Sequence, residues 1–174
     1  MQIGLRIYKI QVYHEHKAQL LTSDKGPADI LQFVRNCCST FSKSPLDDGN
    51  TRIVRFEPAA DPKNGAHGLM RYGKYGYGSQ VEDRKSGAVE HTRTVNQADM
   101  IPLYYRFWLA TGKSYGLLGL QSFGGLSCVD IVNRALVNTH RLMHDDWRLT
   151  MTKLMPNNIE LYGKKNVRSI QLIR

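Results

Sequence analysis

Hydrophobic residues alternate with polar ones along most of the chain, which is the pattern of β-strands that bury one face. The first such stretch is residues 2–13, where β-branched and aromatic side chains alternate with charged ones. Further strands are predicted at residues 51–57, 69–81, 88–95, 103–110, 115–123, 148–154 and 167–173, and among these residues 115–123 form an apolar run without clear alternation.

Two segments instead repeat their hydrophobic residues every three or four positions, as an amphipathic helix does. The first covers residues 27–43 and carries Ile30, Phe33, Val34, Cys37, Cys38 and Phe41. The second covers residues 128–144, and its hydrophobic stripe is Val129, Val132, Leu136, Val137 and Leu142. Pro27 suits the first turn of one helix, and Ser127 is the predicted N-cap of the other.

This order of elements predicts an α+β fold, in which two amphipathic helices pack on a mostly antiparallel β-sheet. The length of 174 residues suggests a single domain, residues 1–174. Residues 115–123 are almost wholly apolar, which predicts a central strand with both faces covered. In the turn before residues 88–95 we expect Gly87 to take a positive φ.

The composition is that of an ordinary folded protein, with 41% hydrophobic and 22% charged residues. No apolar run is long enough to span a bilayer, and the N-terminal pattern is not that of a signal peptide. We therefore predict a cytoplasmic protein without membrane contact. The three cysteines form no C-x-x-C pair, which predicts free thiols, and no cofactor is expected.

Positive charge is the second informative property of the chain, whose formal net charge is +9. In residues 147–174 the only acidic residue is Glu160, against the basic residues Arg148, Lys153, Lys164, Lys165, Arg168 and Arg174. An excess of cations favours association with phosphate-rich polymers, because bound counterions are released. A solubilising surface would explain the same count.

Six of the nine tyrosines lie between His67 and Gly125, among glycines and basic residues on predicted strands. Exposed tyrosines beside cations on a sheet are suited to single-stranded RNA or DNA, since rings stack on bases and cations neutralise phosphates. The predicted nucleic-acid contacts are Arg71, Tyr72, Lys74, Tyr75, Tyr77, Arg93, Lys164, Lys165 and Arg168. The alternative is that the tyrosines are partly buried packing residues, because one face of the sheet must pack against the helices.

The glycines of residues 73–78 do not form a phosphate-binding loop. Such a loop joins a strand to a helix, whereas these glycines lie within a predicted strand. The sequence T-G-K-S at residues 111–114 lacks the earlier glycine and is followed by a strand. ATP or GTP binding is therefore not expected.

A nuclease is the enzymatic alternative, and two sets of residues could support it. A metal-dependent nuclease would use Glu82, Asp83 and Lys85, since carboxylates hold the cation. A metal-independent ribonuclease would use His91 with Arg71 for proton transfer and charge stabilisation. The first set lies in a predicted hairpin turn, where charged residues are common, and the second could meet across the same hairpin.

Two histidine pairs have a spacing that a metal site can use. His140 and His144 lie four residues apart on a helix, and His14 and His16 lie two apart at a strand end. Neither pair has an obvious third ligand, so no metal site is predicted.

Four motifs together resemble the N-terminal part of uncharacterised bacterial proteins associated with phage defence. They are G-L-M-R-Y-G-K-Y-G-Y-G-S, N-Q-A-D-M-I-P-L-Y-Y-R-F-W, G-L-L-G-L-Q-S-F-G-G-L-S and V-R-S-I-Q-L-I-R, within residues 65–174. In those proteins a further domain usually follows, so the resemblance implies that this chain is the N-terminal domain of a longer protein. It assigns no catalytic residue.

The expected function is therefore binding of RNA or DNA, or recognition of a partner, by a domain of a phage-defence type of protein. The partner would be a C-terminal effector domain or another protein. A small nuclease is the first alternative. A structural module that forms homo-oligomers is the second.

Overall fold

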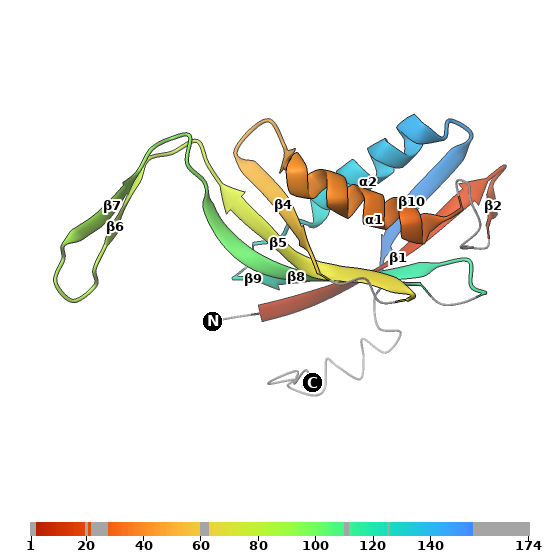
Figure 1. Ribbon diagram of the computed structural model, residues 1–174, viewed down its shortest axis with the longest axis horizontal. Coiled ribbons are helices and arrows are strands. Elements are labelled where there is room, and N and C mark those ends of the chain that lie inside the picture. The colour runs from red at the N-terminus through yellow and green to blue at the C-terminus, as the bar shows by residue number, and fades with distance from the viewer. Residues whose placement is uncertain are drawn as a thin grey trace.

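The computed structural model describes residues 3–19, 21, 28–59, 63–109, 112–124 and 126–154. Within them the predicted α+β class is confirmed, because two helices pack on one face of a curled antiparallel sheet (Figure 1). No helix within these ranges combines the length and the apolar character needed to cross a membrane.

The main sheet has eight strands, and seven of them follow the order β10-β1-β9-β8-β5-β4-β3. Their bounds are β1 Ile3–His14, β3 Leu46–Asp47, β4 Arg52–Pro58, β5 Gly65–Lys74, β8 Asp99–Leu109, β9 Gly116–Phe123 and β10 Trp147–Lys153. The short β2, Lys17–Ala18, pairs with the end of β1. All these pairings are antiparallel.

Both predicted helices are confirmed, as α1 Ile30–Lys43 and α2 Val129–Met143. The carboxylate of Asp29 caps α1 by accepting a hydrogen bond from the Gln32 backbone N–H at 3.0 Å. The N-cap of α2 is Cys128 and not Ser127 as predicted. The Ser127 hydroxyl nevertheless accepts a hydrogen bond of 3.4 Å from the backbone N–H of Val129.

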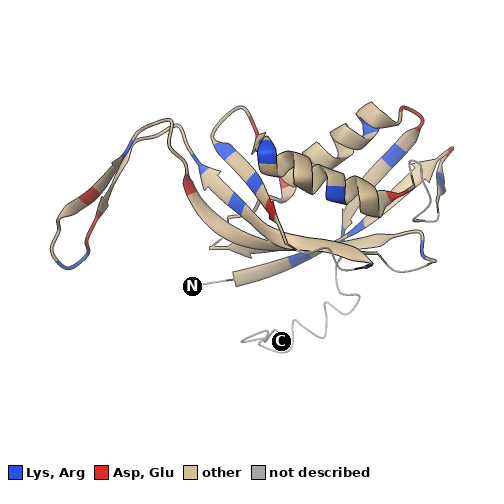
Figure 2. Cartoon of the chain, in the orientation of Figure 1, with Lys and Arg blue, Asp and Glu red and all other residues tan. Residues whose placement is uncertain are grey.

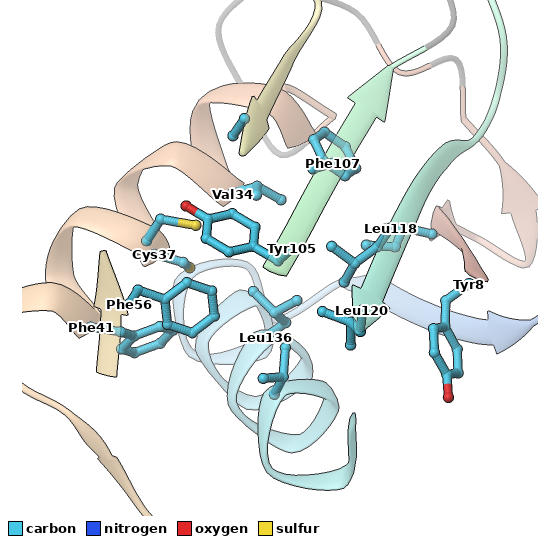
Figure 3. Packing of buried hydrophobic residues seen from close by; sticks show 14 of the residues in the cluster. Tyr8, Val34, Cys37, Phe41, Phe56, Tyr105, Phe107, Leu118, Leu120 and Leu136 are labelled. Atoms are coloured by element: carbon cyan, nitrogen blue, oxygen red, sulfur yellow. The ribbon is translucent and has the colours of Figure 1, made fainter. Parts of the chain in front are cut away.

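The core lies between the helices and the sheet. Figure 3 shows side chains of α1, such as Val34 and Cys37, packed toward Tyr105 and Phe107 of β8. The rings of Phe56 and Tyr105 meet edge to face with centroids 5.1 Å apart. All three cysteines are buried and form no disulfide, so they serve as small hydrophobic residues here.

The predicted strand 69–81 is in fact two strands that belong to different sheets. β5 ends at Lys74, and β6, Ser79–Glu82, pairs only with β7, Val89–Arg93, in a separate two-stranded sheet. We call residues 75–98 the arm, because this hairpin projects away from the main sheet (Figure 1). The break between β5 and β6 falls at Gly76, whose φ of +91° is readily adopted only by glycine. Gly87 has the predicted positive φ, at +71°.

The expectation that residues 115–123 have both faces covered is wrong. β9 is central, but its residues alternate between buried and half-buried, because both described helices lie on the same side of the sheet. The predicted strand 167–173 lies outside the described residues, as do Lys164, Lys165 and Arg168.

Candidate nucleic-acid interface

The sheet has one face against the helices and one face that no described helix covers, which we call the outer face. Alternation along the strands decides which side chains lie on it. On β8 the odd-numbered residues Leu103, Tyr105 and Phe107 are buried, whereas Tyr104 and Trp108 are 38% and 43% exposed. On β1 the even-numbered Tyr8, Ile10 and Val12 are buried. The exposed residues of the outer face are the odd-numbered Ile3, Leu5 and Ile7.

Strand register brings rings and cations together on the outer face. Arg106 on β8 lies between His67 on β5 and Gly119 on β9, its direct partners across the two ladders. The His67 ring also lies near that of Tyr104, with centroids 6.2 Å apart. Trp108 pairs with Leu117, which in turn pairs with Lys9 on β1.

The arginines of the outer face differ in how far their charge is already neutralised. Arg71 donates from its Nε to the Glu57 carboxylate at 2.5 Å, and this hydrogen bond raises the pKa of the guanidinium. Arg106 is exposed and forms no ion pair with any described residue. Arg106 therefore remains available to an anion, whereas Arg71 is already paired.

Comparisons of the chain with models of known protein families, with curated proteins and with solved structures gave no match.

Two of the predicted contacts point into the protein. Tyr72 is only 3% exposed, and burial raises the pKa of its hydroxyl. Arg93 is 7% exposed, and its guanidinium lies 4.2 Å from the centre of the Tyr77 ring. Arg93 also donates to the carbonyl oxygens of Lys74 and Tyr77, each at 3.5 Å, so it fastens the base of the arm. Neither residue offers a stacking or phosphate contact in this structure.

Other predicted contacts lie where the sheet meets the arm. The Tyr75 hydroxyl donates to the Asp47 carboxylate at 2.7 Å, and this hydrogen bond raises the pKa of the tyrosine. Lys74 is exposed at the end of β5, and Tyr77 is 48% exposed within the arm. Lys74 pairs with Asp99 at the start of β8, five residues along the strand from Tyr104 and nine from Trp108.

The two residues predicted for a metal-independent ribonuclease, His91 and Arg71, belong to different sheets. His91 and Glu82 lie on the two strands of the arm, whereas Arg71 lies on β5 of the main sheet. The Asp83 carboxylate accepts hydrogen bonds from the backbone N–H groups of Lys85 and Ser86 and from the Ser86 hydroxyl. These bonds lower the pKa of Asp83, and they show that it shapes the turn at the tip.

The paired histidines of α2 belong to the helix layer. His140 is fully buried, with its ring edge to face against Phe33 at 5.2 Å, and the His144 ring lies 5.1 Å away. In the described ranges, no group of three or more His, Cys, Asp or Glu side chains could hold a metal ion.

Sequence reasoning missed Tyr104, Arg106 and Trp108, because residues 103–110 are bulky enough to look like a wholly buried strand. One signal could have found them. An arginine inside an otherwise hydrophobic strand marks the solvent side, and alternation then places residues 104 and 108 on the same side as Arg106.

Proposed function

We propose that the chain binds single-stranded nucleic acid on the outer face of its main sheet. The observation that carries this proposal is the exposure of Tyr104, Arg106 and Trp108 on one face of a central strand. Rings of this kind stack on unpaired bases, and a cation between them neutralises the backbone phosphate. His67 and Lys9 add a further ring and a further cation beside them.

The spacing on β8 suits a strand of several nucleotides. Alternate residues of an antiparallel strand are roughly 6.8 Å apart, so Tyr104 and Trp108 are separated by roughly 14 Å with Arg106 between them. Duplexes hide their base faces by stacking, so this face supports binding of single strands in preference to duplexes. Stacking and phosphate neutralisation are common to both polymers, so the proposal covers RNA and DNA.

Partner recognition is a second candidate for the same face, and the apolar edge of β1 favours it. Ile3, Leu5 and Ile7 are exposed by 64%, 51% and 41%, and contiguous exposed apolar residues mark interaction surfaces. A protein-binding face has no salt-dependent affinity for oligonucleotides, so the experiment below separates the two functions. The role in phage defence stays a prediction from the resemblance.

The test is the affinity for a fluorescent single-stranded oligonucleotide, measured by anisotropy with RNA and with DNA. Replacing Trp108 by Ala removes one stacking ring, worth roughly 1–3 kcal/mol, and is expected to weaken binding roughly 5- to 150-fold. Tyr104→Ala is expected to act in the same direction. Both side chains are exposed, so the thermal unfolding temperature should change little.

Tyr77→Ala is the matched control, because Tyr77 is an equally exposed tyrosine that lies on the arm. It is expected to leave the affinity unchanged. Gly119→Glu is a second variant that is expected to weaken binding, because the new carboxylate would lie beside Arg106. The side chain can be accommodated, since a Cβ at this position meets its nearest neighbour, Leu5, at 3.5 Å. Absence of binding by the wild type, or equal affinities of the wild type and Trp108→Ala, would overturn the proposal.

A further inference from the structure

A cavity of about 820 Å³ opens at one end of the outer face, where β1 and β10 lie side by side. Its walls include Tyr13 from β1, Arg148 and Thr150 from β10, and two carboxylates from the adjoining turns, Glu15 and Asp146. Protein pockets for small ligands span roughly 300–1,000 Å³, so a nucleotide fits this volume.

The strand register fixes how far the cavity lies from Trp108 on β8. Lys9 pairs with Leu117 on one side and with Thr152 of β10 on the other, and Thr152 lines the cavity. Three strand spacings therefore separate Trp108 from Thr152, which is roughly 14 Å. A strand of nucleic acid that leaves Trp108 across the sheet reaches the cavity next.

Hydrogen bonds hold the walls of the cavity in place. The Tyr13 hydroxyl donates to the Gln11 side-chain oxygen at 3.2 Å, and the Gln11 amide donates to the Ser114 carbonyl oxygen at 3.4 Å. The Thr150 hydroxyl donates to the Gln11 carbonyl oxygen at 3.4 Å. Arg148 is the direct partner of Tyr13 across the ladder, so a ring and a cation face the cavity together.

The turn that carries Glu15 has an unusual backbone. Glu15 and His16 have φ values of +47° and +64°, a conformation that two-residue hairpin turns normally assign to Asn and Gly. A backbone conformation of this kind costs free energy at a residue other than glycine, and such residues cluster at binding sites. Here the turn places Glu15 at the rim of the cavity.

The charges of the cavity are unpaired and of both signs. No described residue forms an ion pair with Arg148, Glu15 or Asp146. Arg148 attracts a phosphate, whereas the two carboxylates repel one and accept hydrogen bonds from N–H donors. A ligand that satisfies both ends has an anionic group at one end and an amino group at the other.

We infer that this cavity is a subsite for a nucleotide whose base carries an exocyclic amino group. Arg148 binds the phosphate, the Tyr13 ring stacks on the base, and Glu15 or Asp146 accepts a hydrogen bond from the amino group. Cytosine, adenine and guanine have such a group, whereas uracil presents a carbonyl oxygen that the carboxylates repel. The inference rests on the proposed function, because the nucleotide belongs to the strand bound by β8.

The test compares oligocytidine with oligouridine of equal length on the intact chain. The wild type is expected to bind oligocytidine about tenfold more tightly, since a hydrogen bond to a charged group contributes about 1.5 kcal/mol. The double variant Glu15→Gln, Asp146→Asn keeps the size of both side chains and is expected to abolish this ratio. Arg148→Gln is expected to weaken binding of both polymers.

Trp108→Ala is the matched control, because it is expected to weaken the binding of both polymers equally and to keep the ratio of their affinities. Thermal unfolding of each variant checks that the fold is retained. Equal affinities of the wild type for the two polymers, with binding that still depends on Trp108, would overturn the subsite and leave the proposed function standing. Failure of the wild type to bind either polymer would overturn both.

Discussion

Arg52 joins the edge of the sheet to the helix layer. Its guanidinium contacts the carboxylate of Asp48 at 2.5 Å and that of Asp130 on α2 at 2.7 Å. The Asp48 carboxylate also accepts hydrogen bonds of 3.0 Å from the backbone N–H groups of Asn50, Thr51 and Arg52. Burial opposes ionisation of Asp48, but these hydrogen bonds outweigh it and hold its pKa well below the usual range.

Asp48→Asn is expected to lower the free energy of unfolding by roughly 1–3 kcal/mol, because Arg52 and the three N–H groups lose a charged acceptor. The pKa of Asp48 is lower in the folded state than in the unfolded state. The contribution of the Asp48 carboxylate to the free energy of unfolding is therefore fully present above about pH 4 and is lost as the pH falls further. Urea unfolding of both proteins from neutral to acidic pH measures this difference.

The difference in stability between wild type and Asp48→Asn should shrink as the pH falls below about 4. A constant difference over that range would contradict the ion-pair explanation. Asp145→Asn serves as the control, since Asp145 is exposed and its carboxylate forms no ion pair with any described cation.

At the scale of elements, the arm stands apart from the rest of the fold. β6 and β7 pair only with each other, and Arg93 is the one buried residue among the described residues 79–93. An isolated two-stranded hairpin is marginally stable in water. This hairpin is held at its base by Arg93 against Tyr77 and by a hydrogen bond of 2.8 Å from the Gly76 N–H to the Val95 carbonyl oxygen.

Replacing residues 77–94 by Asn-Gly is expected to leave the main sheet and its ligand binding intact. Gly76 and Val95 already form a hydrogen-bonded pair that a two-residue turn can close, and Arg93 and Tyr77 are removed together. We expect the unfolding temperature to change by less than about 3 °C, equivalent to less than about 1 kcal/mol. Circular dichroism during heating and the oligonucleotide affinity measure the two effects.

Loss of cooperative unfolding in the shortened protein would show that the arm stabilises the core. A loss of affinity with normal unfolding would instead assign the arm to the binding surface, as the sequence predicted for Tyr77 and Arg93.

At the scale of the whole molecule, the charged residues of the described ranges are distributed over all parts of the fold and do not form one patch. Figure 2 shows lysines and arginines over the helices, the sheet and the arm, with acidic residues among them. The unpaired cations of the proposed binding surface are Lys9, Arg106 and Arg148. Few phosphates can therefore be neutralised at one time, and stacking must supply the remaining affinity.

The logarithm of the binding constant is expected to fall with the logarithm of salt concentration with a slope of about −2, since each phosphate contact on a single strand contributes about −0.7. Arg106→Gln should reduce the slope by about 0.7. Lys43→Gln makes the same change of charge on the last turn of α1, in the helix layer, and should leave the slope unchanged. Equal slopes for all three proteins would place the ligand elsewhere on the molecule.

The sequence by itself determined the fold class and most elements of the described chain, because periods of two and of 3.6 are local properties. It also determined that residues 70 and 72 share one strand face and residue 71 the other. Only the tertiary structure decided which of these faces meets the helices. That choice depends on contacts between distant segments, such as Val34 and Cys37 of α1 against Tyr105 of β8. It turned Tyr72 inward and left Tyr104 and Trp108 exposed, and so moved the candidate surface from β5 to β8.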